Sequence, residues 1–178
     1  MDIFEQKQVL DTMEILVDTR EQNTERARKR YESFGLPYMR ATLNYCDYTY
    51  NATLPDGRKI CDTSETVSPV CAIERKMSLD ELAACLGSGR RRFEDEFQRA
   101  RDHNARIFLI CENATWENLL NGKYRSRLHP NAFKASLIAW AVRYDIGIYF
   151  CKEETSGKLI REILYRDLKE RLEKGEYG

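Results

Sequence analysis

The 178-residue sequence is poor in the residues that build zinc sites. It has two histidines and six cysteines, and no two cysteines form a C-x-x-C pair. Structural zinc sites usually combine such pairs, so the spacing gives a zinc site little support. Four cysteines lie in or beside strand-like segments, which favours reduced packing residues of a cytosolic protein. These are Cys46, Cys71, Cys111 and Cys151.

Long apolar runs are also absent. No stretch of the sequence approaches the ~18 apolar residues of a membrane-spanning helix. The opening MDIFEQKQVL lacks the basic start and the long apolar core of a signal peptide. We therefore expect a soluble, cytoplasmic protein that does not contact membranes.

The sequence has no excess of either charge. Lys and Arg together number 29, as do Asp and Glu, so the formal net charge is zero. A protein with zero net charge is not expected to be a tight, non-specific binder of nucleic acid. Any nucleic-acid contact must therefore come from local basic patches. The length and a hydrophobic content of 42% fit one globular domain over residues 1–178.

Apolar, strand-like segments alternate with segments of helical pattern. The predicted strands cover residues 14–18, one or two segments of 38–54, 70–76, 106–112 and 146–151. The predicted helices cover about 24–34, 78–86, 90–104, 114–122, 129–145 and 153–174. This order predicts an α/β domain in which helices flank a mixed central β-sheet.

Acidic residues accompany several of the predicted strands. Asp18 and Glu21 follow the first strand, Asp47 lies in YCDYTY, and Glu74 ends the apolar run VCAI. Asp80 comes six residues after Glu74, on the first turn of a predicted helix. Mg²⁺ prefers a few oxygen ligands and keeps much of its water, so two carboxylates and a backbone carbonyl would hold it.

The segment ERK at residues 74–76 has a spacing suited to phosphodiester chemistry. Side chains alternate along a strand, so Glu74 and Lys76 are expected on one face and Arg75 on the other. Glu74 would then hold a metal while Lys76 orients or polarises the attacking water. By itself, the same segment is more typical of a solvated strand end than of a catalytic site.

An isolated Asp followed by Glu-x-Lys on a neighbouring strand is the PD-(D/E)XK signature of the restriction-endonuclease-like fold. The sequence more specifically resembles the nuclease domain of the XPF family of structure-specific endonucleases, whose hallmark is GD…ERK-x-x-x-D. The motifs that carry the resemblance occur in order over about residues 14–150. They are ILVDTRE (15–21), CDY (46–48), ERKMSLD (74–80), GRRRFEDEF (89–97) and RIFLICE (106–112).

The resemblance implies a role for each matching residue. Asp47, Glu74 and the carbonyl of Arg75 become ligands of Mg²⁺, for which Mn²⁺ can substitute, and Lys76 becomes the water-orienting cation. The supporting acids of the same site are Asp18, Glu21 and Asp80. The residues expected to contact DNA phosphates are Arg20, Arg75, Arg90, Arg91 and Arg92.

The implied activity is metal-dependent hydrolysis of DNA, with flap, fork, branched or nicked duplex as substrate in repair or recombination. The implied protein is a free-standing nuclease domain of phage or bacterial type, located in the cytoplasm of a bacterium or of a phage-infected host cell. Members of the family often pair, so we also expect a homodimer, formed through the apolar helix 131–142 or the final helix. Two alternatives stay open: a non-catalytic DNA- or partner-binding module of the same fold, and a nuclease that acts on RNA or single strands.

Two positions depart from the family pattern. Cys46 stands where the family has a glycine, which permits unusual backbone angles or a close approach. Glu96 stands where the family usually has glutamine. Asp80 also has a structural alternative, as a helix N-terminal charge favoured by the helix dipole. Three arginines at residues 90–92 oppose the dipole of the helix that they begin, which favours an anionic partner.

Overall fold

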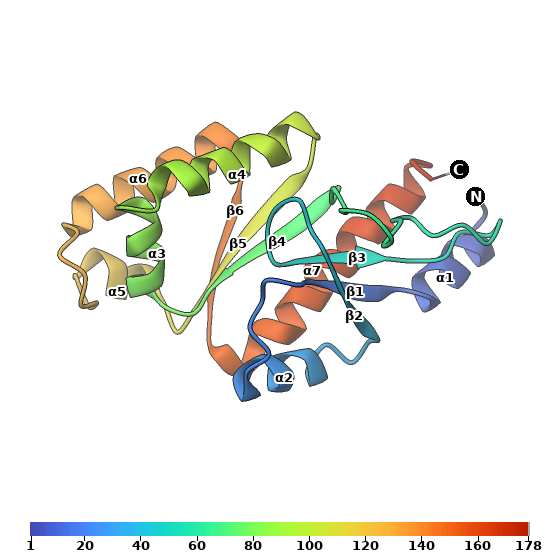
Figure 1. The fold of residues 1–178 in the computed structure, drawn as a ribbon, viewed down its shortest axis with the longest axis horizontal. Helices are drawn as coiled ribbons and strands as arrows, with labels where there is room; N and C mark the ends of the chain where they lie inside the picture. Colours follow the sequence, from blue (N-terminus) through green and yellow to red (C-terminus); the bar gives the residue numbers. More distant parts are fainter. Residues whose placement is uncertain (178) are drawn as a thin grey trace.

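A six-stranded mixed β-sheet runs through the molecule in the order β2-β1-β3-β4-β5-β6 (Figure 1). The computed structural model describes residues 1–177. The strands are β1 (Glu14–Asp18), β2 (Tyr38–Ala41), β3 (Tyr48–Asn51), β4 (Cys71–Lys76), β5 (Arg106–Glu112) and β6 (Gly147–Cys151). β1 pairs in parallel with β2, β3 is antiparallel to both β1 and β4, and β4, β5 and β6 run parallel.

Helices cover both faces of the sheet (Figure 1). One face packs against α1 (Ile3–Asp11), α2 (Glu25–Glu32) and α7 (Glu153–Glu173). The other face packs against α3 (Leu79–Leu86), α4 (Arg90–Asp102), α5 (Trp116–Leu120) and α6 (Pro130–Tyr144). The predicted architecture, a mixed sheet flanked by helices, is confirmed. Among the described residues, no helix combines the length and apolar character needed to span a membrane.

The structure departs from the sequence prediction at the N-terminus, where α1 precedes the first strand. The helix begins with a capping box: the Asp2 carboxylate accepts from the amides of Phe4 and Glu5, and the Glu5 carboxylate accepts from the Asp2 amide. The acidic residues at positions 2 and 5 were therefore an available helix-start signal. The aromatic segment 38–54, predicted as one or two strands, contains both β2 and β3.

The alternation of side chains along β4 divides the two hydrophobic cores. Cys71 and Ile73 pack in the core on the α7 side, whereas Ala72 packs in the core on the α4 and α6 side. The charged end of the strand continues the same alternation. Glu74 and Lys76 therefore lie toward α4, and Arg75 lies toward α2, as the sequence predicted.

Helix α7 approaches α2 closely at Gly157. A Cβ atom on Gly157 would lie 1.9 Å from Ser33 Oγ and 2.5 Å from the Arg30 carbonyl oxygen, both far inside normal contact. Only glycine fits between the two helices here. This contact fixes the position of α2, and α2 in turn carries side chains toward the charged end of β4.

We predict that Gly157→Ala destabilises the protein, although alanine has the better helix propensity. Overpacking costs about 1–3 kcal/mol, which exceeds the roughly 1 kcal/mol gained in propensity. Urea denaturation should show a net loss of unfolding free energy of up to about 2 kcal/mol. The matched control is Lys158→Ala, an exposed neighbour on the same helix, which should change stability little. Equal stability of the two variants would contradict the close approach.

Candidate active site

The backbone places Asp47 beside the end of β4. The Asp47 amide donates to the Ile73 carbonyl at 2.9 Å, and its own carbonyl accepts from the Asp18 amide at 2.8 Å. The Arg75 amide then donates to Asp47 Oδ2 at 2.7 Å. Three segments that are distant in sequence are thus joined at one residue, which brings the acids of β1, β3 and β4 to one end of the sheet.

Cys46 has a left-handed backbone conformation, with φ of 62°. A residue with a side chain rarely adopts this region, which explains why a glycine suits the position. The Cys46 amide donates to Glu96 Oε1 at 2.6 Å. The two residues that depart from the expected pattern are therefore in contact, and the Glu96 carboxylate holds the strained turn that precedes Asp47.

Glu74 and Lys76 form a buried ion pair on the α4 side of the sheet. Glu74 is only 4% exposed, and Lys76 Nζ donates to its Oε1. The ammonium also lies 5.0 Å from the ring centroid of Phe93, a cation–π contact. Burial alone would lower the pKa of Lys76, but the nearby charges of Glu74 and Asp47 outweigh it and raise the pKa. Lys76 is thus held protonated.

The carboxylates of this site are poorly compensated in the absence of a metal. Burial raises the pKa of Asp47 to about 7, with a further contribution from the charge of Glu21, while Lys76 opposes the shift. Burial and the charge of Asp47 likewise raise the pKa of Glu74 well above its ordinary value. One lysine cannot neutralise both groups. A hard dication with oxygen ligands fits this donor set, because it would supply the missing positive charge.

A second charged cluster lies on the opposite face of the same strand end. Glu112, at the end of β5 and fully buried, accepts from Arg30 Nε at 2.9 Å and from Arg75 Nη1 at 3.1 Å. Tyr48 Oη donates to Glu21 Oε2 at 3.0 Å and accepts from Arg30 at 3.3 Å. The sequence prediction missed Glu112 and Arg30. In the sequence, Glu112 is marked only by its charge at the end of an apolar strand. Arg30 is marked only by its place on one face of a predicted helix.

The other predicted acids have partners that the fold supplies. The buried Asp18 carboxylate accepts from the amide and guanidinium of Arg20 and from the Leu43 amide. Asp80 accepts from the amides of Arg125 and Ser126 at 2.7 and 2.9 Å and so ties α3 to the basic loop 123–127. Both carboxylates brace neighbouring loops, and a direct catalytic role for either stays a prediction.

A hollow of about 670 Å³ lies beside the site, between α2 and the start of α4. Arginines dominate its lining, and these are Arg20, Arg26, Arg30, Arg75 and Arg92. Arg30 and Arg75 are buried or nearly so and paired with Glu112, whereas Arg92 is exposed and forms no ion pair with residues 1–177. Arg91 likewise forms none within the described part of the chain, and Arg90 pairs with Glu94 at 3.1 Å.

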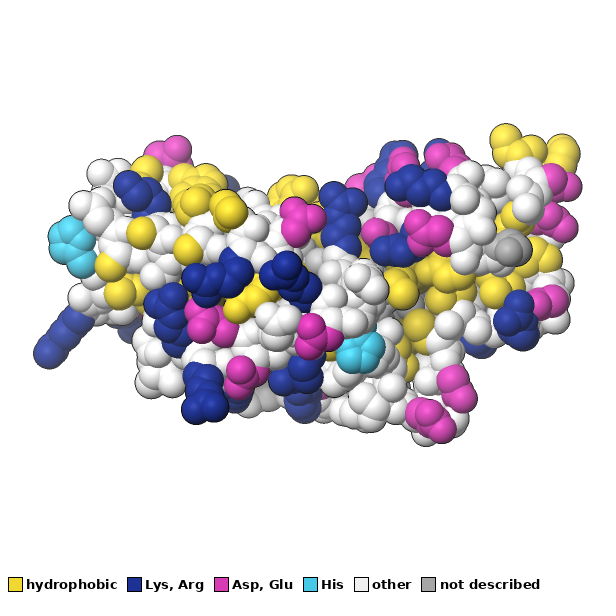
Figure 2. Space-filling model, turned by 90° about the horizontal axis from the view of Figure 1, so that it is seen from above, with side chains coloured by type: hydrophobic (Ala, Val, Ile, Leu, Met, Phe, Trp, Pro, Cys, Tyr) yellow, Lys and Arg dark blue, Asp and Glu magenta, His cyan; other side chains and the backbone are white. Residues whose placement is uncertain are grey.

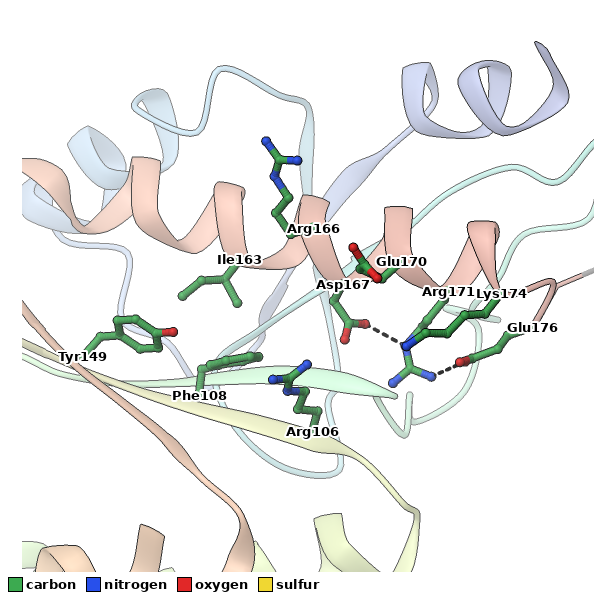
Figure 3. A pocket seen from close by; sticks show the side chains of 10 residues that line it. All are labelled: Arg106, Phe108, Tyr149, Ile163, Arg166, Asp167, Glu170, Arg171, Lys174 and Glu176. Carbon is green, nitrogen blue, oxygen red and sulfur yellow. Dashed lines mark hydrogen bonds and ion pairs between the residues drawn. The ribbon is translucent and has the colours of Figure 1, made fainter. Parts of the chain in front are cut away.

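A second hollow of about 370 Å³ lies between α7 and strands β5 and β6 (Figure 3). Three of its charged side chains pair with one another: Arg171 contacts Asp167 at 2.7 Å and Glu176 at 2.5 Å. The guanidinium of Arg106 lies 5.1 Å from the ring centroid of Phe108. None of the site residues predicted from the sequence lines this hollow, whereas Arg20, Glu21, Arg75 and Arg92 line the hollow beside β4.

Comparisons with known proteins identify a family and a fold for this chain. The model of the family described as "ERCC4 domain" matches residues 17–163. Among curated proteins, none matches the sequence significantly.

Two similar solved structures are of XPF from Aeropyrum pernix. One has a TM-score of 0.61 and 21% sequence identity, with 92% of this chain and 69% of that chain covered. The other, a complex with DNA, has a TM-score of 0.60 and 23% identity, with 88% and 65% covered. This chain therefore spans about two thirds of the length of either structure. The likeness shows that the chain has the restriction-endonuclease-like fold of the XPF nuclease domain.

We predict a pH-dependent stability that comes from Asp47. Its folded-state pKa of about 7 lies above the ordinary 3.8, so the folded protein binds the proton more tightly than the unfolded chain. This contribution to stability is present at low pH and is lost as the pH rises through about 7. In chelator, Asp47→Asn should flatten the fall in melting temperature between about pH 4 and 7. Parallel melting curves of wild type and variant across this range would contradict the shift.

Proposed function

Because the chain belongs to the ERCC4 domain family, we propose that it is a metal-dependent DNA endonuclease that hydrolyses phosphodiester bonds in branched or nicked duplex DNA. The observation that carries the proposal is the meeting of Asp47, Glu74 and Lys76 at the end of β4. Two carboxylates share one lysine there, beside a hollow lined by arginines. One of the two similar XPF structures is a complex with DNA, which supports DNA as the substrate.

The residues proposed to hold Mg²⁺, or Mn²⁺ in its place, are Asp47, Glu74 and the carbonyl of Arg75. The donor set consists of oxygen atoms, and its raised carboxyl pKa values match a need for positive charge. When bound, the ion would polarise the scissile phosphate and lower the pKa of a coordinated water. The hydrogen bond from the Arg75 amide keeps the Asp47 carboxylate oriented for this role.

Lys76 is proposed to orient the attacking water or the phosphate. The nearby carboxylates hold it protonated, so it donates hydrogen bonds and does not act as a general base. Its ammonium is fixed on one side by Glu74 and on the other by the Phe93 ring. A cation fixed in this way costs little reorganisation when negative charge develops on the phosphate.

DNA is proposed to approach through the arginine-lined hollow. Arg20 and Arg92 line it, Arg91 is a neighbour of Arg92, and Arg75 and Arg90 complete the predicted contact set. Figure 2 shows basic and acidic side chains interspersed among apolar ones on one face of the molecule. With a net charge of zero, affinity depends on these few phosphate contacts and on substrate shape, which favours a structure-specific nuclease over a general one.

A homodimer is also proposed. Helix α6 exposes Val142 at 80% and Ile138 at 45%, one turn apart on the side away from the core. Pairing of two such faces would bury apolar surface and place two basic hollows on one DNA molecule.

We predict that Asp47→Asn and Glu74→Gln each reduce Mg²⁺-dependent cleavage of flap, fork and junction DNA by about 100-fold or more. Each change removes an anionic ligand while keeping the size of the side chain. The control is Glu162→Gln, which changes an exposed carboxylate on α7 and should cleave as wild type does. Undiminished cleavage by both site variants would refute the proposed metal ligands. Tight binding of branched DNA without any nick, in Mg²⁺ or Mn²⁺, would favour the non-catalytic binding module instead.

We predict that Arg91→Ala and Arg92→Ala weaken binding of branched DNA. Each lost phosphate contact should lower the slope of log K against log salt by roughly 0.9. Arg166→Ala, on α7 and away from the hollow, serves as a control of equal charge change. An equal loss in all three variants would indicate a general charge effect and not a contact at the start of α4.

We predict that the wild-type protein sediments as a dimer at micromolar concentration and that Val142→Glu shifts it to monomer. A charge placed in a paired apolar face loses its hydration, which disfavours association. Lys134→Glu, an exposed change near the other end of α6, is the control for charge alone. A wild type that remains monomeric would contradict the proposed interface.

A further inference from the structure

Cys46 lies against the carboxylates of Glu74 and Glu96. The Cys46 Sγ atom and one oxygen of each carboxylate all lie within 4.8 Å of one another. Cys46 comes from the turn before β3, Glu74 from β4 and Glu96 from α4, so only the folded chain brings them together. The pattern of cysteine spacing in the sequence gives no sign of this group.

One donor of the group, the Cys46 sulfur, is buried and lacks a hydrogen-bond partner. Cys46 is 1% exposed, and among residues 1–177 its sulfur makes no hydrogen bond. The Glu74 side chain is 5% exposed, and its Oε1 accepts from Lys76. The group therefore places an unpartnered buried thiol beside a carboxylate that is paired with one lysine.

The third donor leaves a route to solvent. Glu96 is half-buried, and its Oε1 accepts from the Cys46 amide. The three donors lie within 4.8 Å of one another, so small side-chain adjustments would bring them to the roughly 3.5 Å that separates the ligands of a tetrahedral zinc ion. The fourth position would face the open side of Glu96 and take water.

The donor atoms of the group suit a dication that binds sulfur. Glu74 and Glu96 offer carboxylate oxygens, and Cys46 offers a thiol. Burial and the charge of Glu74 raise the pKa of this thiol, so it loses its proton only when a metal–sulfur bond forms. Sulfur with two carboxylate oxygens is a borderline-soft donor set, which favours Zn²⁺ or Cd²⁺ and not Mg²⁺.

We propose that Cys46, Glu74 and Glu96 form a binding site for one thiophilic dication of the Zn²⁺ or Cd²⁺ class. On binding, a metal–sulfur bond forms, the thiol S–H bond breaks, and its proton passes to solvent. Glu74 is also a proposed ligand of Mg²⁺. The two cations therefore compete for it, a consequence that rests on the proposed function.

The test is a titration of the metal-free full-length protein with Cd²⁺, followed by the ultraviolet thiolate-to-metal absorption band and by calorimetry. Wild type should bind one equivalent with the band. Cys46→Ser should lose the band, and the control Cys61→Ser should keep it, since Cys61 is half-buried and lies outside the carboxylate cluster. A wild type without the band, or a Cys46→Ser variant that keeps it, would overturn the proposal.

Glu96→Gln provides a second variant that does not depend on changing the cysteine. The amide oxygen can still accept from the Cys46 amide, so the turn is kept while the anionic donor is lost. Its Cd²⁺ affinity should fall by on the order of tenfold or more. An unchanged affinity would remove Glu96 from the site.

Competition separates this site from the nuclease proposal. Millimolar Mg²⁺ should weaken Cd²⁺ binding to wild type, and Asp47→Asn should abolish this effect while keeping the absorption band. A Cd²⁺ band in a protein that never cleaves DNA would support the thiophilic site and refute the nuclease. Mg²⁺-dependent cleavage by a protein without the band would do the reverse.

Discussion

The end of β4 determines the arrangement of the site, because three consecutive charged residues emerge there on the two faces of a buried strand. Glu74 and Lys76 continue the face that packs on α4, and Arg75 continues the face that packs on α2 and α7. Apolar packing of Cys71, Ala72 and Ile73 fixes which face is which. A shift of one residue in register would exchange the acid and the guanidinium and would bury the wrong charges on both sides.

The two charged clusters differ in how fully their acids are compensated. On the α2 side, Glu112 is held by the guanidinium groups of Arg30 and Arg75, so the cluster resembles a structural ion-pair network. On the α4 side, Asp47 and Glu74 share Lys76, and the Glu96 carboxylate lies near Glu74. The fold supplies positive charge to the first cluster, and we propose that a bound cation supplies it to the second. This difference in charge compensation, more than the presence of acids, distinguishes a structural ion-pair network from a candidate catalytic site.

Cys46 affects both the backbone path of the site and the donor atoms that the site contains. Its left-handed backbone turns the chain so that the next residue, Asp47, reaches β4, and a glycine would do this without strain. The side chain that replaces the glycine's hydrogen brings a sulfur to the acids. The Glu96 carboxylate both fixes the turn through the Cys46 amide and joins the same cluster. Departures from a family pattern thus alter the donor chemistry of the site and not its backbone frame.

The sequence by itself determined the fold class, most of the element boundaries, and the alternation that separates Glu74 and Lys76 from Arg75. These follow from periodicity and strand geometry, which are local. It missed α1, whose capping acids are a short-range signal, and it missed Arg30 and Glu112, whose partners lie 82 residues apart. Only the tertiary structure decided that Asp80 ties down the 123–127 loop, that α7 needs Gly157 to meet α2, and that Cys46 lies among carboxylates. The reason is physical: which charge is compensated depends on groups brought together by packing across the sheet, and sequence spacing does not encode that.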